Sequence, residues 1–399
     1  MDFNSRKIIE ALRSGVPSRD AGRYFSSARP KIMRDIESAL DKAAEDRQSG
    51  GMIITGKYGE GKTHLLNTVF DMASEKNMAV SLVTLSKETP VYKLPLLYQK
   101  IMQNTYLPGR VQPGVERIFE NISLNAPVAQ AMFEYALTSL MSDKLYYVLK
   151  SYLGTGDEDE RFLLLADMEG DFLSNGDINR VYRRVFSKKA TYKAPFYKTQ
   201  HSWDYMSFMS RLFVEAGLQG WVILFDETEL IGRLSKKARI NSYLNIMNFL
   251  KPENLTAVFS MFAFTASYVP DVIDAKHEYA NMDAAGLQPG IKERAEAVLD
   301  LIGQAPQLAP LSDAELLEVL GKIQDYHSTA FDWTPNIDAR RILEVTEKNG
   351  GKLLRAKIRT TIEMFDQLYQ YGECGNISLN SLGEAGYEED ASLEELAEM

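Results

Sequence analysis

The sequence of 399 residues has little cysteine and no long hydrophobic run. Its one cysteine, Cys374, excludes an internal disulfide framework and a thiolate metal cluster, and it predicts a reducing compartment. No apolar run approaches the roughly 20 residues that a membrane-spanning helix needs, and the first residues lack the apolar core of a signal peptide. We therefore expect a cytoplasmic protein with no membrane partner. The four histidines are far apart, and none pairs with another at helical metal-ligand spacing: His64, His201, His277 and His327.

Basic residues are missing from the end of the chain, because no lysine or arginine follows Arg359. Residues 1–359 carry 45 basic and 45 acidic side chains, so the formal net charge of −10 belongs to the ten acidic residues of 360–399. We expect an acidic, disordered tail at 374–399, which either shields a basic patch or keeps the protein in solution. The neutral body leaves nucleic-acid binding open, although the net charge alone would disfavour it.

The rest of the chain, with hydrophobic residues at 45% overall, predicts an α/β fold. A strand, loop, helix and strand follow one another between Met52 and Leu85, which is typical of a parallel sheet. Further strands are expected at 221–225 and 259–265. Ser312 and Glu315 form a capping box ahead of a helical set near the end. The expected parts are an N-terminal helical entry segment (1–50), a core (51–300), a C-terminal helical lid (301–373) and the tail (374–399).

The strongest motif is a complete phosphate loop, G-x-x-x-x-G-K-[ST], at residues 56–63. It follows an apolar strand and opens a helix, so its backbone N–H groups can curl around phosphate oxygens at the positive end of the helix dipole. Lys62 is expected to reach the β- and γ-phosphates, and the Thr63 hydroxyl to bind Mg²⁺. The alternative is a tight glycine turn without a ligand. The expected nucleotide-binding residues are Gly56, Lys57, Tyr58, Gly59, Glu60, Gly61, Lys62, Thr63 and His64.

Two carboxylates follow the apolar run Val222–Phe225. They are expected at the C-terminal end of a buried strand, where parallel sheets bind ligands. Asp226 is predicted to orient Mg²⁺ and its waters, and Glu227 to polarise the water that attacks the γ-phosphate. Alone, such a pair is often only a polar strand exit. Together with the phosphate loop, it favours ATP hydrolysis.

Other residues are candidates for the same reaction. Thr265 ends the strand expected between the two motifs, where a hydroxyl either bonds the attacking water or γ-phosphate or only caps the strand. Arg355, after the Gly350-Gly351 break, is a candidate lid arginine that senses the γ-phosphate. Arg233 and Arg239 are candidates for an arginine finger that acts on a neighbouring subunit, or are charges on a solvated helix.

Residues 180–200 hold seven basic and five aromatic residues and no acidic one. Cations interleaved with aromatic rings suit phosphate contact and base stacking in nucleic acid. A basic face of this kind equally suits an acidic protein surface or the chain's own tail. The predicted nucleic-acid contacts are Arg183, Arg184, Lys188 and Lys189.

The motifs in this order resemble those of AAA+-type ATPases, especially the branch related to origin-recognition proteins, and Gly56–Thr63 and Val222–Glu227 are the matching stretches. The segment Ile8–Pro17, together with GKYGEGKTHLL, DETELI and GGKLLRAKIR, is similar to the ATP-binding proteins of BREX phage-defence systems, the BrxD family. The resemblance covers most of residues 5–373. It implies ATP binding beside helicase or methyltransferase components that act on DNA.

The interval between the two motifs is long for AAA+ proteins, so residues 107–200 are expected as an inserted helical module. We therefore predict an α/β P-loop NTPase of AAA+ type, with a parallel sheet, a helical insertion and a C-terminal helical lid. It is expected to use ATP and Mg²⁺, to act as an ATPase, to form a homo-oligomer, and to couple nucleotide state to DNA or partner binding in phage defence. The alternative is an ATP-dependent scaffold or switch with little turnover that recruits defence partners.

Overall fold

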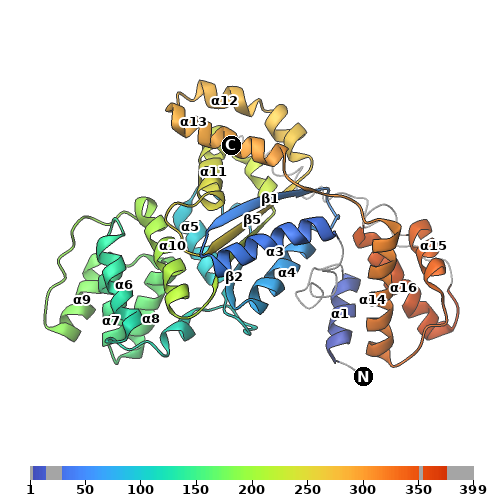
Figure 1. Ribbon diagram of the computed structural model, residues 1–399, viewed down its shortest axis with the longest axis horizontal. Coiled ribbons are helices and arrows are strands. Elements are labelled where there is room, and N and C mark those ends of the chain that lie inside the picture. Colours follow the sequence, from blue (N-terminus) through green and yellow to red (C-terminus); the bar gives the residue numbers. More distant parts are fainter. Residues whose placement is uncertain (1–2, 15–28, 350–353, 375–399) are drawn as a thin grey trace, which may run out of the picture. The chain divides into compact units, whose positions relative to one another are not determined.

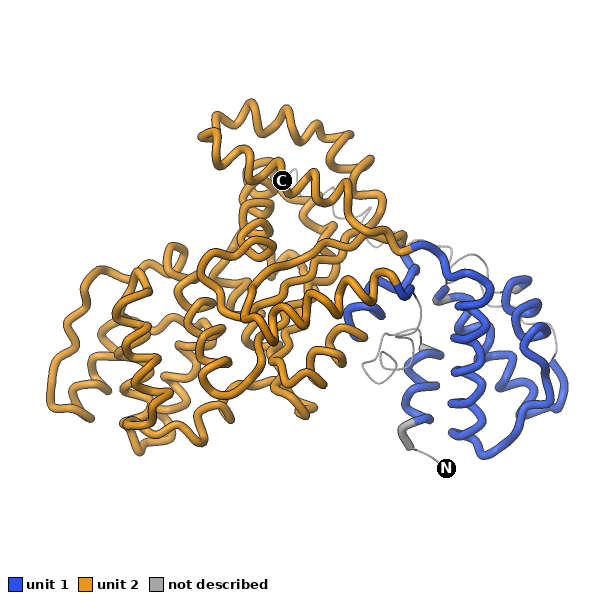
Figure 2. The backbone as a smooth tube through the Cα atoms, in the orientation of Figure 1, with its two compact units in different colours: residues 1–30, 58–67, 309–399 blue, residues 31–57, 68–308 orange. Residues whose placement is uncertain are grey.

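The computed structural model describes residues 3–14, 29–349 and 354–374. The chain forms two compact units, each built from separate stretches of sequence (Figure 2). Unit 1 comprises residues 1–30, 58–67 and 309–399, and unit 2 comprises residues 31–57 and 68–308. The acidic tail expected at 374–399 lies outside the described residues apart from Cys374.

Unit 2 contains a six-stranded sheet (Figure 1). Its strands lie in the order β3-β2-β4-β5-β1-β6, and all neighbours are parallel except β3, which runs antiparallel to β2. The parallel α/β sheet that the sequence predicted is therefore present. The two-residue strands β3 and β6 were not predicted, because two residues are too few to show an alternating pattern. The strands are β1 (Gly50–Gly56), β2 (Met78–Thr84), β3 (Thr105–Tyr106), β4 (Gly220–Asp226), β5 (Val258–Thr265) and β6 (Gln307–Leu308).

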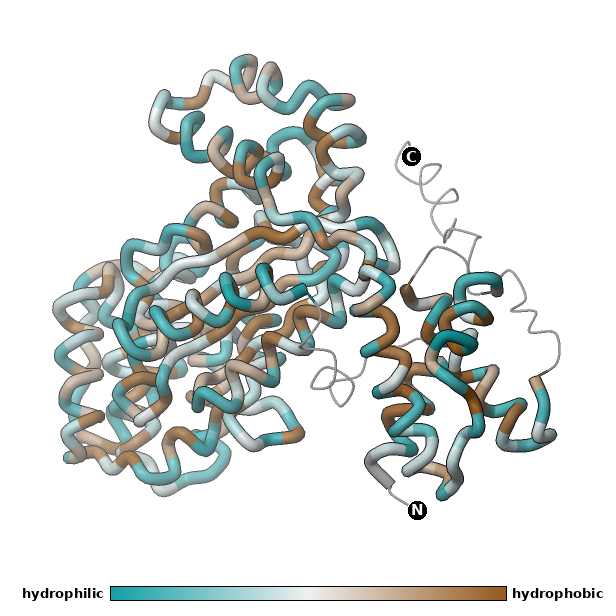
Figure 3. The backbone as a smooth tube through the Cα atoms, turned by 45° about the vertical axis from the view of Figure 1, so that its right-hand side comes forward, coloured by the Kyte–Doolittle hydropathy of each residue, from teal (hydrophilic) through white to brown (hydrophobic). Residues whose placement is uncertain are grey.

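The central strands β4 and β5 are buried along almost their whole length. Figure 3 shows the hydropathy of each residue along the chain. All seven residues of β4 are buried, which is typical of a parallel sheet covered by helices. The main helices of this part are α3 (Pro30–Glu45), α4 (Lys62–Glu75), α5 (Leu94–Gln103), α10 (Lys198–Glu215), α11 (Lys236–Leu250), α12 (Glu278–Ala284) and α13 (Pro289–Gly303). None of the helices in the described ranges is both long and apolar enough to cross a membrane.

Four helices between β3 and α10 form a group of their own within unit 2 (Figure 1). Helix α7 contacts α6, α8 and α9, and α6 contacts α10. A buried ion pair lies inside this group, where Lys144 Nζ donates to Asp167 Oδ1 at 2.8 Å and both side chains are fully buried. The helices are α6 (Pro127–Thr138), α7 (Lys144–Gly154), α8 (Glu158–Ala166) and α9 (Asn175–Phe186).

Unit 1 is a helical cluster that joins both ends of the described chain. Helix α1 packs on α14 and α16, and α15 packs on both of these. The expected entry segment 1–50 is thus divided, because the apolar face of α1 is buried among C-terminal helices while α3 lies mostly in unit 2. The capping box at Ser312 and Glu315 is confirmed. The helices are α1 (Phe3–Ser14), α14 (Asp313–Phe331), α15 (Ala339–Asn349) and α16 (Leu354–Tyr371).

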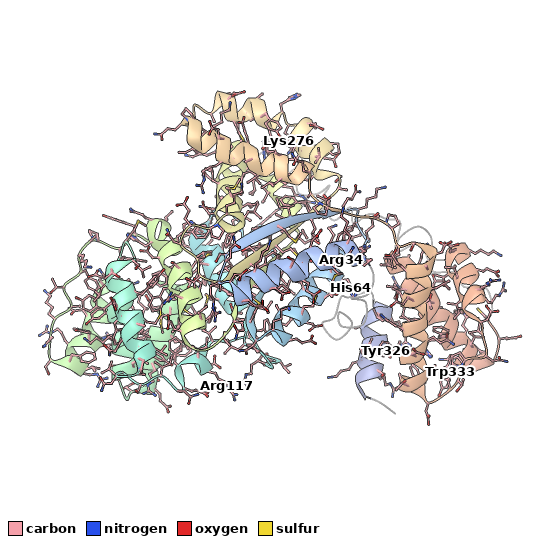
Figure 4. All side chains as sticks on the ribbon, in the orientation of Figure 1. Arg34, His64, Arg117, Lys276, Tyr326 and Trp333 are labelled. Carbon is pink, nitrogen blue, oxygen red and sulfur yellow. The ribbon has the colours of Figure 1, made fainter. Side chains whose placement is uncertain are left out.

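A polar network ties these helices together. Trp333, labelled in Figure 4, donates its indole N–H to His327 Nδ1 at 2.9 Å, so that nitrogen is an acceptor. His327 Nε2 lies 3.0 Å from Asp366 Oδ1, and Arg13 donates to both oxygens of Asp366, at 2.8 and 3.1 Å. Side chains from α1, α14 and α16 thus meet at one carboxylate.

Candidate nucleotide-binding site

The phosphate loop connects the end of β1 to the start of α4. Gly59 and Gly61 have φ of +78° and +92°, in the left-handed region that a side chain disfavours. The Leu65 N–H donates to the Gly61 oxygen at 2.9 Å, which begins the ladder of a 14-residue helix. Lys62 is 8% exposed at the first position of that helix. This strand, glycine loop and helix have the local geometry of an anion-binding loop.

Asp226 and Glu227 lie at the end of the fully buried strand β4. Asp226 is 5% exposed, and its Oδ1 accepts the backbone N–H of Glu227 at 3.0 Å. Glu227 has a φ of +56°, an uncommon conformation for a residue other than glycine. This bend ends the strand and leads into the 3-10 helix η3 (Thr228–Arg233).

The sheet brings the predicted strand ends to one edge. β5 lies between β1 and β4, as the sequence predicted, and all three are parallel. Gly56 pairs in register with Thr265, and the Ala266 N–H donates to the Gly56 oxygen at 3.1 Å. Two strand spacings separate β1 from β4, or about 10 Å. Gly56, Thr265 and Asp226 therefore end neighbouring strands at the same edge.

Within unit 1, the loop is contacted by residues far away in the sequence. The position that a Cβ on Gly61 would take is 3.8 Å from Arg29 Nη1 and 3.8 Å from Leu354 Cδ2, at the start of α16. Burial of the His64 ring, together with Arg29, lowers the pKa of His64 to about 4, so this imidazole is neutral at pH 7. Arg355 follows Leu354 in α16, but its side chain lies outside the described residues.

The two arginine-finger candidates differ in exposure. Arg233 is exposed at the end of η3. Arg239 is 6% exposed and donates to both carboxylate oxygens of Glu278, at 3.0 and 2.5 Å, and to the Leu234 oxygen at 2.7 Å. The Tyr243 hydroxyl donates to the same carboxylate at 3.0 Å. Arg239 is thus held inside its own chain, an arrangement that does not suit a residue reaching into a neighbouring subunit.

The basic stretch 180–200 separates into exposed cations and buried rings. Arg183, Lys188 and Lys189 are exposed, and no side-chain hydrogen bond or ion pair joins them to other described residues. Arg184 instead forms an ion pair with Glu160, which raises the pKa of its guanidinium. This pairing makes Arg184 a poorer phosphate contact than the sequence suggested.

The aromatic residues of this stretch mostly pack inward. Tyr182 packs edge-on against Tyr147, with ring centroids 5.0 Å apart. Phe196 lies 4.1 Å from the Lys144 ammonium and stacks on His201. Among the five rings, Tyr197 alone is exposed. The stretch therefore offers charges for phosphates, whereas the interleaved stacking platform that the sequence suggested is largely part of the protein core.

The strand ends supply a small set of oxygen donors. No group of three or more His, Cys, Asp or Glu side chains is arranged to hold a metal ion in the part of the chain that the structure describes. Mg²⁺ in nucleotide sites needs only one or two protein oxygens, because phosphates and water supply the others. The Asp226 carboxylate, at the end of β4, supplies oxygens of this kind.

Comparison with known proteins supports a nucleotide as the ligand of this loop. A family model described as "BREX system ATP-binding protein BrxC/D" matches residues 2–126 and 197–378. The chain belongs to the BrxC/D family. A search of the curated proteins found no match. The BrxC/D match leaves out residues 127–196, which span α6 to α9 and carry the exposed cations, and this interval lies inside the range 107–200 expected as an insertion.

Sequence reasoning missed two residues that organise these surroundings, Arg29 and Glu278. Both act through contacts to residues at least 30 positions away, so no local motif marks them. The one signal for Arg29 is its place directly before Pro30, where a helix begins.

Proposed function

We propose that this BrxC/D-family protein is a Mg²⁺-dependent ATPase of AAA+ type that couples nucleotide state to DNA or partner binding in phage defence. One observation carries the proposal. A phosphate loop follows β1 and an Asp-Glu pair follows β4, and β5 with its terminal Thr265 lies between these two parallel strands. The C-terminal helices α14 to α16 are the proposed lid.

In this proposal, the loop N–H groups and Lys62 bind the β- and γ-phosphates. Thr63 and Asp226 hold Mg²⁺, which neutralises charge that develops on the phosphates. Glu227 accepts a proton from the attacking water, and Thr265 orients that water from the strand between them. The left-handed backbone of Glu227 costs of the order of 1 kcal/mol, and strain of this kind is common at functional residues.

Phosphate release with Glu227→Gln separates an ATPase from a scaffold that binds ATP without turnover. We expect the variant to lose 10²-fold or more of the wild-type rate while still binding ATP, because it lacks only the general base (roughly 10²–10⁴-fold). Lys62→Ala should lose ATP binding as well. Glu253→Gln, on a side chain that is 78% exposed, is the control and should match the wild type. Equal, near-zero rates for wild type and Glu227→Gln would leave the scaffold function.

DNA contact is proposed for the exposed cations of the α9 region, Arg183, Lys188 and Lys189. Since the nearby rings are mostly packed inward, these residues suit the phosphate backbone, and the binding should be independent of base sequence. An acidic surface of a BREX helicase or methyltransferase component is the alternative partner. Retention of the protein on DNA, but not on an acidic polypeptide of equal charge, favours DNA.

A homo-oligomer is proposed in which Arg233, rather than Arg239, faces the nucleotide of the next subunit. Its exposed position at the end of η3 supports this choice. Mass measurement with and without ATP tests the assembly. Arg233→Ala should keep the ATP-dependent mass and lose turnover, whereas a protein that stays monomeric with ATP would exclude an arginine finger.

A further inference from the structure

Arg29 reaches the phosphate loop from the residue before Pro30. Its Nη2 donates to the backbone oxygen of Glu60 at 2.7 Å and to that of Ala309 at 3.2 Å. Its Nη1 is 3.8 Å from the Cβ position of Gly61. All of these residues belong to unit 1. A guanidinium thus lies against the peptide group that joins Glu60 to Gly61.

The orientation of that peptide decides where the Gly61 N–H points. The Glu60 carbonyl and the Gly61 N–H belong to one trans peptide group, so they point in opposite directions. A charge-assisted hydrogen bond to the carbonyl holds the plane and polarises the N–H at its other side. In a phosphate loop, these N–H groups turn inward to the anion. The hydrogen bond from Arg29 to the Glu60 carbonyl therefore favours one orientation of the Gly61 N–H.

The other end of Arg29 is fixed to α14. Its backbone N–H donates to Glu315 Oε1 at 3.1 Å. The second oxygen of Glu315 accepts from Ser312, from the backbone N–H at 2.9 Å and from the hydroxyl at 2.8 Å. Arg29 also has a φ of +62°, an uncommon conformation for a residue before proline. Two hydrogen-bonded ends thus hold this residue in an unfavourable backbone conformation.

We infer that Arg29 is a positioning residue of the nucleotide site, which orients the Glu60–Gly61 peptide for phosphate binding and links the loop to the start of α14. The inference rests on the proposed ATP binding. It assigns the link between the loop and the C-terminal helices to an N-terminal residue that lies outside both sequence motifs. The loss of this hydrogen bond to a charged group should weaken binding of ATP and ADP by roughly tenfold.

Titration with fluorescent ATP, ADP and AMP analogues tests this role in the full-length protein. Arg29→Ala should bind ATP and ADP about tenfold more weakly, and AMP nearly as the wild type does, since the loop cradles the β-phosphate. Arg29→Lys keeps a charged donor and should regain most of the affinity. Arg340→Ala removes an exposed arginine of the same unit and serves as the control.

The possible results separate the proposed function from the positioning role. Wild-type protein that binds none of the nucleotides refutes the proposed function itself. If the wild type binds ATP, and Arg29→Ala binds it as tightly as Arg340→Ala does, the positioning role alone is overturned. It is also overturned if Arg29→Ala loses as much affinity for AMP as for ATP. If Arg29→Ala does not fold, Arg29→Gln, which keeps one N–H donor without the charge, replaces it, and an unchanged ATP affinity in that variant also overturns the inference.

Discussion

Replacing Lys144 by Met should expose how strongly the helical group α6 to α9 depends on one buried charge pair. Asp167 accepts hydrogen bonds from Lys144 at 2.8 Å, from the Tyr205 hydroxyl at 2.7 Å and from the Leu173 N–H at 2.6 Å. Burial raises the pKa of Asp167 and lowers that of Lys144, so each charge depends on the other. Removal of one partner of a buried pair costs about 3–5 kcal/mol of unfolding free energy.

The loss of unfolding free energy in this variant should depend on pH. Without Lys144, Asp167 is expected to be protonated in the folded state, because burial then raises its pKa still further above the ordinary aspartate value of 3.8. The unfolded chain releases that proton above pH 3.8, so the variant loses stability as pH rises, by about 1.4 kcal/mol per pH unit. The loss of unfolding free energy relative to wild type should be about 4 kcal/mol at pH 7, and at pH 5 it should be smaller by up to about 3 kcal/mol.

Urea unfolding followed by tryptophan fluorescence measures this difference. The chain has three tryptophans, of which Trp203 and Trp221 belong to unit 2 and Trp333 to unit 1, so a Trp333→Phe background reports on unit 2. The double variant Lys144→Met/Asp167→Asn should regain at least half of the loss, because the Asn oxygen still accepts from its two other donors. A single-variant cost below 1 kcal/mol at pH 7, or one equal at pH 5 and pH 7, would refute the reasoning.

Further predictions concern the loop, its histidine and the exposed cations. Gly61→Ala should abolish ATP binding with a small loss of stability, because the backbone φ of +92° at this residue is strained for alanine. Normal ATP binding by this variant in a filter assay would contradict the prediction. The folded-state pKa of His64 is depressed to about 4, so between pH 6.5 and 4 the unfolded state binds more protons than the folded state. As pH falls through this range, the wild type should therefore lose up to about 3 kcal/mol of unfolding free energy relative to His64→Gln, as measured by thermal unfolding. Equal pH profiles of the two proteins would show that the ring is solvated. The triple variant Arg183→Glu/Lys188→Glu/Lys189→Glu should lower the slope of log K against log salt concentration for DNA binding by about three. A triple change of equal charge on the surface of α15 should leave that slope unchanged. Equal slopes for the wild type and the first variant, measured by fluorescence anisotropy, would exclude these residues as DNA contacts.

Local motifs predicted the parts of the site that depend on neighbours in sequence. The glycine pattern at 56–63 lies between an apolar strand and an amphipathic helix, and both elements formed as expected. β5 was correctly expected between the two strands that carry the motifs. Rules for the connections between parallel strands leave few possible strand orders for a sheet of four such strands. The capping box at Ser312 was readable because its two partners are three residues apart.

Contacts between distant residues were not predictable from pattern. The rings of 180–200 alternate with cations in the sequence, yet Tyr182 packs on Tyr147 and Phe196 packs on Lys144, so composition alone misjudged which side chains are exposed. The surface position of Arg239 was misjudged for the same reason, because its partner Glu278 lies 39 residues further on. Such pairings depend on how the helices pack.

Unit 1 is built from stretches far apart in the sequence, and this affects the order in which its contacts form during synthesis. Arg13 meets Asp366 across 353 residues of chain, so this contact of α1 cannot form until α16 has left the ribosome. At roughly 5–20 residues per second, this wait lasts about 20–70 s. The sheet of unit 2 is complete at Leu308, whereas Ala309 and Glu315, the partners of Arg29, come later. A nascent chain therefore completes its sheet first, and Arg29, beside its phosphate loop, acquires the contacts to Ala309 and Glu315 only afterwards.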